Sequence, residues 1–282
     1  MKHKETAGNP ISIKEQLDKV EASCQLKTKH PIEIAFAIPL KSKAVSHDWT
    51  RVQASLSKTL RSILGSTDQQ FRILIAGHEK PQIAELNNER VTWLPVDCPP
   101  PTDSNGFSKD RGHKRRAIGA YLRKSGFSGY FMPLDADDWI HYRFVEFIRS
   151  RPRSDAFVLN NGFMVNENRQ EVWMRDRFYR GCGSSAAYYF ANHDFPLTSR
   201  KEDSQNTLFG MVVKSHQDVI QHLEQYNKDY ILVELPLATY VLAHGDNWTF
   251  TIGNLDNEVS AKNYRAKGEK LRDWYYDYFK IK

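Results

Sequence analysis

Three carboxylates end an apolar run in the middle of the chain, in the sequence YFMPLDADDW at 130–139. Carboxylates repel one another, so packing alone gives no reason to cluster them. A divalent cation such as Mg²⁺ or Mn²⁺ does, because it takes oxygen ligands from one or two carboxylates and the rest from phosphates and water. Side chains alternate along an extended chain, so Asp135 and Asp137 share one side. The pattern predicts that these two bind a metal at the carboxyl edge of a sheet. A solvated acidic turn that caps a helix is the alternative.

The densest positive block of the chain, KDRGHKRR at 109–116, lies upstream of these carboxylates. A helix is expected from Ser108 or Asp110 to about Lys124, and phosphate groups bind to cations and to helix N-termini. We therefore expect Arg111 and Lys114 to contact a diphosphate. A solvated basic face is the alternative. Nucleic acid binding favours basic and aromatic side chains spread over a wide surface, so the compact block indicates a small anionic ligand and no nucleic acid.

A late histidine is the third candidate. His244 follows an apolar segment and precedes Gly245 and Asn247. Neutral imidazole is a good ligand for Mn²⁺ and for borderline metals, and the small glycine suggests a tight turn that faces a ligand. A purely structural histidine is the alternative.

The bulk properties fit a soluble globular protein. The chain has 282 residues, 40% of them hydrophobic and 26% charged, with a net charge of +6 that indicates an anionic partner. It has no apolar stretch of about 18 residues that could span a membrane, and its first residues lack the apolar core of a signal peptide. The three cysteines, Cys24, Cys98 and Cys182, are far apart and fit a reducing, cytoplasmic location.

Strand and helix signals alternate over the first 140 residues. Buried strands are expected at 33–39, 71–77, 91–96 and 130–134, with helices at 49–64 and about 108–124, and the segment 98–107 is expected to be a loop. This order predicts an α/β fold with a mostly parallel central sheet flanked by helices. Neither a GxGxxG fingerprint nor a P-loop is present.

The second half is expected to contain strands at 156–160, 171–174, 186–190, 230–235 and 239–243, a helix at 218–225 and a loop at 192–207. We expect three parts: a polar N-terminal arm at 1–30 with a short helix at 13–20, a domain at 31–253 that divides near residue 140, and an amphipathic C-terminal helix at 254–282. The apolar stripe of that helix contains Leu271, Trp274, Tyr275, Tyr278 and Phe279. Docking of the stripe on the protein's own core is favoured over peripheral contact with the inner face of a membrane.

Six segments in order resemble a glycosyltransferase of the GT-A fold, similar to the family-two-like bacterial enzymes that use nucleotide sugars. They are IAFAIPL at 34–40, SLSKTLRSIL at 55–64, AGHEKP at 76–81, DRGHKRRAIGA at 110–120, YFMPLDADDW at 130–139 and YVLAHGDNW at 240–248. The resemblance covers residues 32 to 250. It implies a GT-A fold for 31–253, with the nucleotide-binding half at 31–140 and the acceptor half at 141–253.

The resemblance also implies roles for single residues. Pro39 would line the nucleobase pocket, and His78 and Glu79 would contact the base or ribose, although the family usually has an acidic pair there. Asp135 and Asp137 would form the DxD motif that holds ribose and metal, and Arg111 and Lys114 would face the diphosphate. Asp138 and Trp139 would face the donor sugar, and His244 with Asn247 would close over the metal and diphosphate.

The resemblance implies that the catalytic base lies at the start of the helix before the last strands, in the sequence Ser215-His216-Gln217-Asp218. Asp218 is the first choice and His216 the second, with Glu202 and Asp203 in a rival loop. The base would deprotonate an acceptor hydroxyl as it attacks the anomeric carbon of a UDP-, GDP- or dTDP-sugar, with inversion.

The expected function is therefore metal-dependent transfer of a sugar to a glycan or glycolipid acceptor, in bacterial surface polysaccharide synthesis. One alternative is a catalytically inactive nucleotide- or carbohydrate-binding protein on the same fold. Another is a phosphatase or phosphotransferase that uses Asp135 as its nucleophile.

Overall fold

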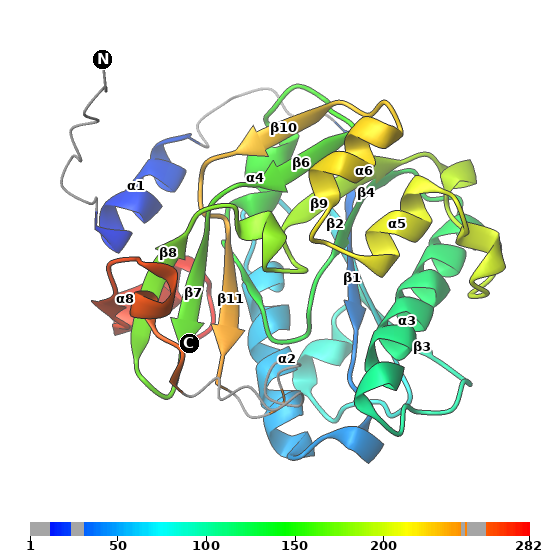
Figure 1. Ribbon diagram of the computed structural model, residues 1–282, viewed down its shortest axis with the longest axis horizontal. Coiled ribbons are helices and arrows are strands. Elements are labelled where there is room, and N and C mark those ends of the chain that lie inside the picture. Colours follow the sequence, from blue (N-terminus) through cyan, green and yellow to red (C-terminus); the bar gives the residue numbers. More distant parts are fainter. Residues whose placement is uncertain (1–11, 24–30, 244–245, 247–257) are drawn as a thin grey trace.

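The structure is a computed structural model that describes residues 12–23, 31–243, 246 and 258–282 (Figure 1). It contains two sheets. The strands are β1 (Ile34–Pro39), β2 (Phe71–Gly77), β3 (Val91–Pro95), β4 (Gly129–Pro133), β5 (Trp139–Ile140), β6 (Ala156–Leu159), β7 (Gly162–Asn166), β8 (Glu171–Arg175), β9 (Ala186–Phe190), β10 (Tyr230–Val233), β11 (Ala238–Leu242) and β12 (Glu269–Lys270). The α-helices are α1 (Ile13–Ser23), α2 (Trp49–Leu64), α3 (Ser104–Lys124), α4 (Phe144–Arg149), α5 (Leu208–Lys214), α6 (Val219–Gln225) and α8 (Asp273–Tyr278).

The first sheet has the order β10-β6-β9-β4-β1-β2-β3. The pairs β4–β1, β1–β2, β2–β3 and β10–β6 are parallel, and β9 runs antiparallel to both of its neighbours. The expected α/β class, with a mostly parallel central sheet flanked by helices, is confirmed. Parallel neighbours place their carboxyl ends at one edge of the sheet, and this arrangement brings the end of β4 beside the end of β1.

Helices cover both faces of this sheet, as β1 illustrates. Its residues Ile34, Phe36 and Ile38 pack in one cluster with the apolar face of α2. The intervening Ala35 and Ala37 face a second cluster, formed with α3, α5 and α6. A strand buried on both faces is apolar throughout, which explains why the expected strand at 33–39 matches β1.

Helix α3 begins at Ser104, four residues before the expected start at Ser108. Asp103 is its N-cap, and the Asp103 Oδ1 atom accepts a hydrogen bond of 2.8 Å from the backbone of Gly106. The end of the expected loop at 98–107 therefore belongs to the helix. Arg111 and Lys114 lie in the second and third turns of α3, and the expectation that they stand at a helix N-terminus is wrong.

The second sheet, in the order β12-β8-β7-β11-β5, was not expected from the sequence. The chain leaves the first sheet after β4, and Trp139 pairs with Thr239 of β11 in antiparallel fashion. Strand β7, which lies between two expected strands, pairs with β11 and with β8. The short helix α5 was also missed, inside a stretch for which no helix was expected.

Both described ends of the chain pack against the second sheet. Leu271, Tyr275 and Phe279 of the C-terminal segment are buried in a cluster with Ile13 and Leu17 of α1. The predicted docking of this stripe on the core is therefore observed. The helix itself is shorter than expected, because the described part of 254–282 contains β12, a 3₁₀ turn and the six-residue α8.

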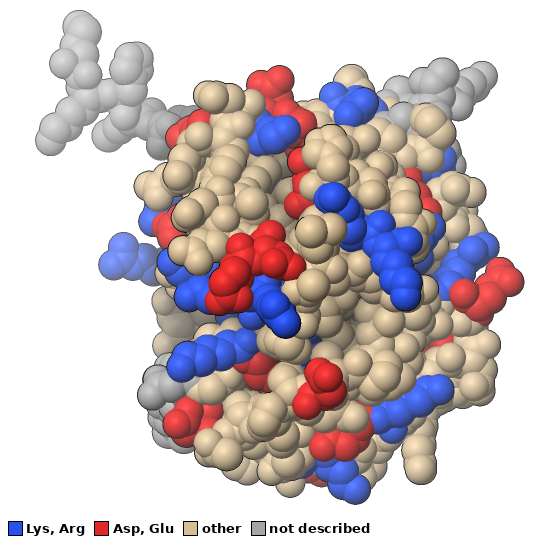
Figure 2. Space-filling view, turned by 90° about the vertical axis from the view of Figure 1, so that its right-hand side faces the viewer, with Lys and Arg blue, Asp and Glu red and all other residues tan. Residues whose placement is uncertain are grey.

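Charged side chains are mixed on the face that carries α3 and α5. Figure 2 shows separate groups of basic and acidic side chains there, on a largely uncharged surface. The positive net charge is thus not gathered into one continuous basic area on this face. Within the described part of the chain, no helix combines the length and apolar character needed to span a bilayer.

Candidate nucleotide and metal site

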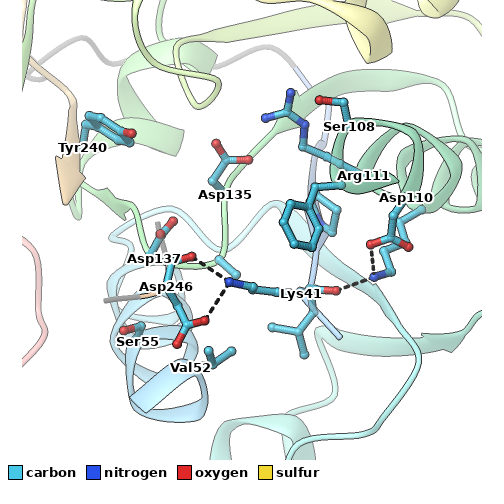
Figure 3. Close-up of a pocket in the computed structure, with 15 residues that line it drawn as sticks. Lys41, Val52, Ser55, Ser108, Asp110, Arg111, Asp135, Asp137, Tyr240 and Asp246 are labelled. Atoms are coloured by element: carbon cyan, nitrogen blue, oxygen red, sulfur yellow. Dashed lines mark hydrogen bonds and ion pairs between the residues drawn. The ribbon is translucent and has the colours of Figure 1, made fainter. Parts of the chain in front are cut away.

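A cleft opens at the carboxyl ends of β1 and β4. Pro39 and Lys41 of the β1 end line it, with Asp135 and Asp137 after β4 and Arg111 of α3 on the facing wall. Figure 3 shows Asp135 between the α3 wall and the side that carries Asp137. The first two carboxylates of the DADD run and a cation of the basic block therefore meet at one sheet edge, as a nucleotide site in an α/β fold requires.

The carboxylate of Asp135 is held by its neighbours on one side only. Arg115 donates a hydrogen bond of 3.0 Å to the Oδ1 atom of Asp135, and the backbone N–H of Asp135 donates one of 2.9 Å to the Oγ atom of Ser184. The Oδ2 atom has no hydrogen bond to a described residue and lies next to Gly183. A Cβ atom at Gly183 would stand 2.9 Å from this oxygen.

Arg115 itself is buried beneath the cleft. Burial lowers the pKa of its guanidinium to about 10, against the opposing effect of the Asp135 charge. The side chain is still protonated at neutral pH, so it fixes Asp135 in place and neutralises part of its charge.

Asp138 and Trp139 point away from the cleft, and the expectation that they face a donor sugar is wrong. Asp138 is fully buried and accepts hydrogen bonds from the Ser184 hydroxyl and from the backbone N–H of Val241. Burial, with the charges of Asp137 and Asp135, raises the pKa of the Asp138 carboxyl well above its usual range. Trp139 is 1% exposed and packs against Phe279. The pairing of β5 with β11 turns both side chains into the core.

Lys114 and Arg111 differ in how many of their donors are already used. The Nζ atom of Lys114 is buried and donates to the Oδ2 atom of Asp110 at 2.6 Å and to the backbone oxygen of Leu40 at 2.7 Å. Lys114 therefore ties α3 to the end of β1 and forms part of the cleft wall. Arg111 makes no hydrogen bond or ion pair with a described residue, and its guanidinium lines the cleft. Of the two, Arg111 has its donors available to a ligand.

His78 and Glu79 lie beside the cleft without lining it. The carboxylate of Glu79 accepts hydrogen bonds from the Ser42 hydroxyl at 3.1 Å and from the backbone N–H of Lys43 at 2.9 Å. It holds the loop that follows β1. The Nε2 atom of His78 lies 2.9 Å from the backbone oxygen of Cys98. The Glu79 carboxylate, which was predicted to contact a base or ribose, thus bonds to Ser42 and Lys43 of the protein instead.

Lys41 and Asp246 were missed by the sequence analysis. The Nζ atom of Lys41 donates a hydrogen bond of 2.7 Å to the Oδ1 atom of Asp246, which is 7% exposed. Asp246 also accepts from the backbone N–H groups of His47 and Asp48. These contacts fasten the segment after β11 to the segment after β1, and Asp246 lines the cleft beside Asp137 (Figure 3). A lone acidic residue carries no sequence signal for such a role.

Two expected residues of the same segment, His244 and Asn247, lie outside the described residues. Asp246, which stands between them in the sequence, lines the cleft. The metal role expected for His244 and the diphosphate role expected for Asn247 therefore stay predictions. Tyr240 of β11, which was not among the expected site residues, lines the cleft on the same side.

The two candidate bases have different surroundings. Asp218 is exposed at the N-terminal end of α6 and is not a lining residue of the cleft. His216 is partly buried, and burial lowers its pKa, with the charge of Asp135 acting in the opposite direction. Three guanidinium groups lower the pKa of His216 further, those of Arg111, Arg115 and Arg175. His216 is also not a lining residue of the cleft, but the charges that surround Asp135 act on its pKa.

The donor set fits a hard divalent cation. Asp135 and Asp137 both present carboxylates to the cleft, and the Oδ2 atom of Asp135 accepts no hydrogen bond from a described residue. Mg²⁺ and Mn²⁺ are bound in this way, through one or two carboxylates with phosphate and water oxygens completing the shell. These two residues could hold such an ion next to a bound diphosphate.

Comparisons with known proteins do not identify the family. No protein-family model matches the chain, and no curated protein sequence matches it. Among solved structures, the chain is similar to the inositol-1-phosphate CTP transferase from T. maritima, with a TM-score of 0.43 and 10% sequence identity. The match covers 90% of this chain and 97% of that one. At this level of similarity, function has to be argued from the cleft itself.

Proposed function

We propose that the protein is a metal-dependent glycosyltransferase that moves a sugar from a nucleoside diphosphate to an acceptor hydroxyl. One observation carries the proposal. Asp135 and Asp137 share a cleft with the guanidinium of Arg111, which has no hydrogen bond or ion pair to a described residue, at the carboxyl edge of a parallel sheet. Two carboxylates attract a divalent cation, and the cation and the guanidinium together match the charge of a diphosphate.

The lining of the cleft combines apolar and charged side chains. Pro39, Leu40 and Val52 supply apolar surface that suits a nucleobase, and Phe107 adds an aromatic ring. Asp135, Asp137 and Arg111 supply charge. Such a lining suits a UDP-, GDP- or dTDP-sugar, whose base and diphosphate need both kinds of contact.

In the proposed reaction, an oxygen of the acceptor attacks the anomeric carbon of the sugar. The bond from that carbon to the diphosphate oxygen breaks, and its electron pair leaves with the nucleoside diphosphate. Arg111 would bind the oxygens on which negative charge develops. A divalent cation on Asp135 and Asp137 would neutralise more of that charge.

His216 is the candidate for the base that we favour, because the charges of Asp135 and Arg111 act on it, whereas Asp218 is exposed at the start of α6. A neutral imidazole can accept the proton of the attacking hydroxyl. Attack from the face opposite the leaving group would give inversion. The acceptor is proposed to be a glycan or glycolipid. The protein is proposed to work in the cytoplasm, where it would transfer sugars during the synthesis of surface polysaccharide.

A thermal-shift screen of nucleoside diphosphates and their sugars, with and without Mn²⁺, tests the proposal. We expect UDP, GDP or dTDP compounds to raise the melting temperature only with metal, because ligands that bind the folded state stabilise it. Asp137→Ala should abolish this shift, whereas Asp176→Ala, a change at an exposed carboxylate away from the cleft, should not. Equal shifts in both variants would contradict the proposed site.

Release of the nucleotide from the sugar donor then separates the alternatives. A glycosyltransferase should release nucleoside diphosphate faster with acceptor present, and should lose this activity in Asp137→Ala. Binding of nucleotide sugar without any release would favour a binding protein. Release of inorganic phosphate from a phosphomonoester would favour a phosphatase instead.

A further inference from the structure

A second cluster of metal-binding side chains lies next to the cleft. His78 follows β2, Cys98 follows β3 and Asp110 belongs to α3. The Nε2 atom of His78 is 3.7 Å from the Sγ atom of Cys98 and 3.9 Å from the Oδ1 atom of Asp110. One ligand atom from each residue lies within 4.8 Å of the other two. Residues far apart in the sequence therefore present nitrogen, sulfur and oxygen to one point.

These separations are close to those of a tetrahedral zinc site. Zinc bonds of about 2.0–2.1 Å to nitrogen, 2.3 Å to sulfur and 2.0–2.2 Å to oxygen, at tetrahedral angles, place ligand atoms about 3.3–3.6 Å apart. The observed 3.7 and 3.9 Å exceed these values slightly. Side-chain movements that bring the three ligand atoms, now within 4.8 Å of one another, closer together would complete the coordination.

The cluster also contains a buried acceptor that lacks a partner. The side chains of His78 and Asp110 are only 9% and 10% exposed. Within the described part of the chain, the Oδ1 atom of Asp110 is buried with no hydrogen-bond donor. The other oxygen, Oδ2, is held by Lys114 at 2.6 Å, so the carboxylate is fixed with Oδ1 toward His78. A buried carboxylate oxygen without a donor costs stability, and a bound cation would remove that cost.

We propose that His78, Cys98 and Asp110 bind one Zn²⁺ ion, with water as the fourth ligand. Binding replaces the proton of the Cys98 thiol, which is released to solvent. The Nε2 atom of His78 gives up its contact with the backbone oxygen of Cys98, and the ring proton moves to Nδ1. The mixed donors favour zinc, whereas the carboxylates Asp135 and Asp137 favour Mg²⁺ or Mn²⁺, so the two sites select different ions.

The zinc ion would join three segments next to the cleft, of which α3 also lines it. These are the ends of β2 and β3 and the first half of α3. Asp110 is bonded to Lys114, which in turn is bonded to the backbone of Leu40 at the end of β1. The ion would thus fix the part of α3 that carries Arg111. This inference stands on the cluster alone and does not depend on the proposed glycosyl transfer.

Titration of the purified full-length protein with Co²⁺ tests the site, because thiolate-bound cobalt gives a charge-transfer band in the near ultraviolet. We expect one equivalent of Co²⁺ to produce the band, and Zn²⁺ to remove it by displacement. The band should vanish in Cys98→Ser and persist in Cys24→Ser and Cys182→Ser. It should also persist in Asp137→Ala, since a cobalt ion on carboxylates alone lacks the sulfur ligand. Absence of the band in the native protein, or its survival in Cys98→Ser, would overturn the proposal.

A second measurement follows the reactivity of Cys98 in the native protein. Zn²⁺ should slow alkylation of Cys98 by iodoacetamide, and EDTA should restore the rate, as peptide mass mapping of the modified cysteine can show. His78→Gln should weaken zinc affinity by at least about 10-fold, since changes even beyond the ligand shell cost that much. Circular dichroism spectra would verify that the variants are folded. Equal alkylation rates of Cys98 with and without Zn²⁺ would count against the site.

Discussion

Polar groups in the cleft and in the aromatic cluster of the second sheet differ in their partners. In the cleft, the guanidinium of Arg111 and the Oδ2 atom of Asp135 have no hydrogen bonds to described residues. In the aromatic cluster, the buried hydroxyl of Tyr275 pairs with the Thr239 hydroxyl at 2.6 Å. A polar group without a partner in the protein lowers stability unless a ligand or water provides that partner. The difference indicates that these cleft groups are available to a ligand, whereas the Tyr275–Thr239 pair stabilises the second sheet.

Among the substitutions that test this comparison, replacing Arg111 should produce the largest effect on binding. Arg111→Gln removes a charged donor, and a hydrogen bond to a charged group contributes about 1.5–3 kcal/mol, which is roughly a 10- to 100-fold loss of affinity. Isothermal titration with the nucleoside diphosphate that gives the largest thermal shift would measure it. Lys124→Gln, on the exposed end of the same helix, is the matched control. Similar losses in the two variants would mean that only net charge matters.

Trp139 tests the other side of the comparison. Because Trp139 packs against Phe279 in the core, Trp139→Phe should lower the free energy of unfolding by less than the roughly 3–5 kcal/mol of a full truncation. The affinity for the nucleotide sugar should stay unchanged. Urea unfolding and titration calorimetry give the two quantities. A variant of normal stability with a weakened affinity for the nucleotide sugar would indicate that Trp139 contacts the ligand.

The second sheet should also respond to acid. Burial, with the charges of Arg143 and Lys280, lowers the pKa of His141 to about 3, even though the Glu21 carboxylate lies 3.5 Å from its Nε2 atom. In the unfolded chain a histidine titrates near about 6.5. Between these values the unfolded state binds more protons, so the free energy of unfolding should fall as the pH decreases from about 6.5 toward 3.

His141→Asn should make this pH dependence shallower. The Nδ1 atom of His141 accepts a hydrogen bond from the backbone of Arg143, and the side-chain oxygen of asparagine can take its place. Urea unfolding of both proteins at pH 7, 6 and 5 would measure the slopes. Identical slopes would show that His141 contributes no proton uptake on unfolding.

The smallest effect is expected at Gly183. Gly183→Ala would place a methyl group 2.9 Å from the Oδ2 atom of Asp135, and a small rotation of the carboxylate about the Oδ1 atom that Arg115 holds would relieve this contact. We expect little change in stability and a weaker affinity for Mn²⁺, measured by titration calorimetry. Gly126→Ala is the control for a glycine-to-alanine change away from the cleft, because its added Cβ meets open space and should leave the Mn²⁺ affinity unchanged. Its positive φ predicts a modest loss of stability. Unchanged Mn²⁺ affinity in Gly183→Ala would argue against Oδ2 as a ligand.

Local patterns were sufficient to predict strands β1 to β4 and helix α2. Strand β1 is apolar along its whole length, and α2 has an N-cap at Asp48 and its C-cap at Gly65, so both elements have clear signals in the sequence. The placement of Asp135 and Asp137 at the sheet edge follows from the end of β4. These features depend on neighbouring residues alone.

The misplaced residues depend on distant parts of the chain. Asp138 and Trp139 turn inward because β5 pairs with β11, about 100 residues later in the sequence, and no local pattern announces that pairing. Helix α5 had a signal that could have found it, since the Thr207 hydroxyl caps it by accepting from the Gly210 backbone. The ion pair between Lys41 and Asp246 had no signal in the sequence, because nothing in the sequence relates two single charged residues that lie far apart.

The burial of α1 beside the C-terminal segment has a consequence for biosynthesis. The backbone N–H of Ile13 donates a hydrogen bond of 3.0 Å to the Oε1 atom of Glu269, and both regions complete one apolar cluster. Strands β1 to β4, which form the cleft, are translated long before residue 269. The first sheet can therefore begin to form before the C-terminal segment is available to cover the second sheet. A chain paused between these two stages would have its first strands in place while the aromatic surface of the second sheet is still uncovered, and a chaperone would then have the largest apolar surface to shield.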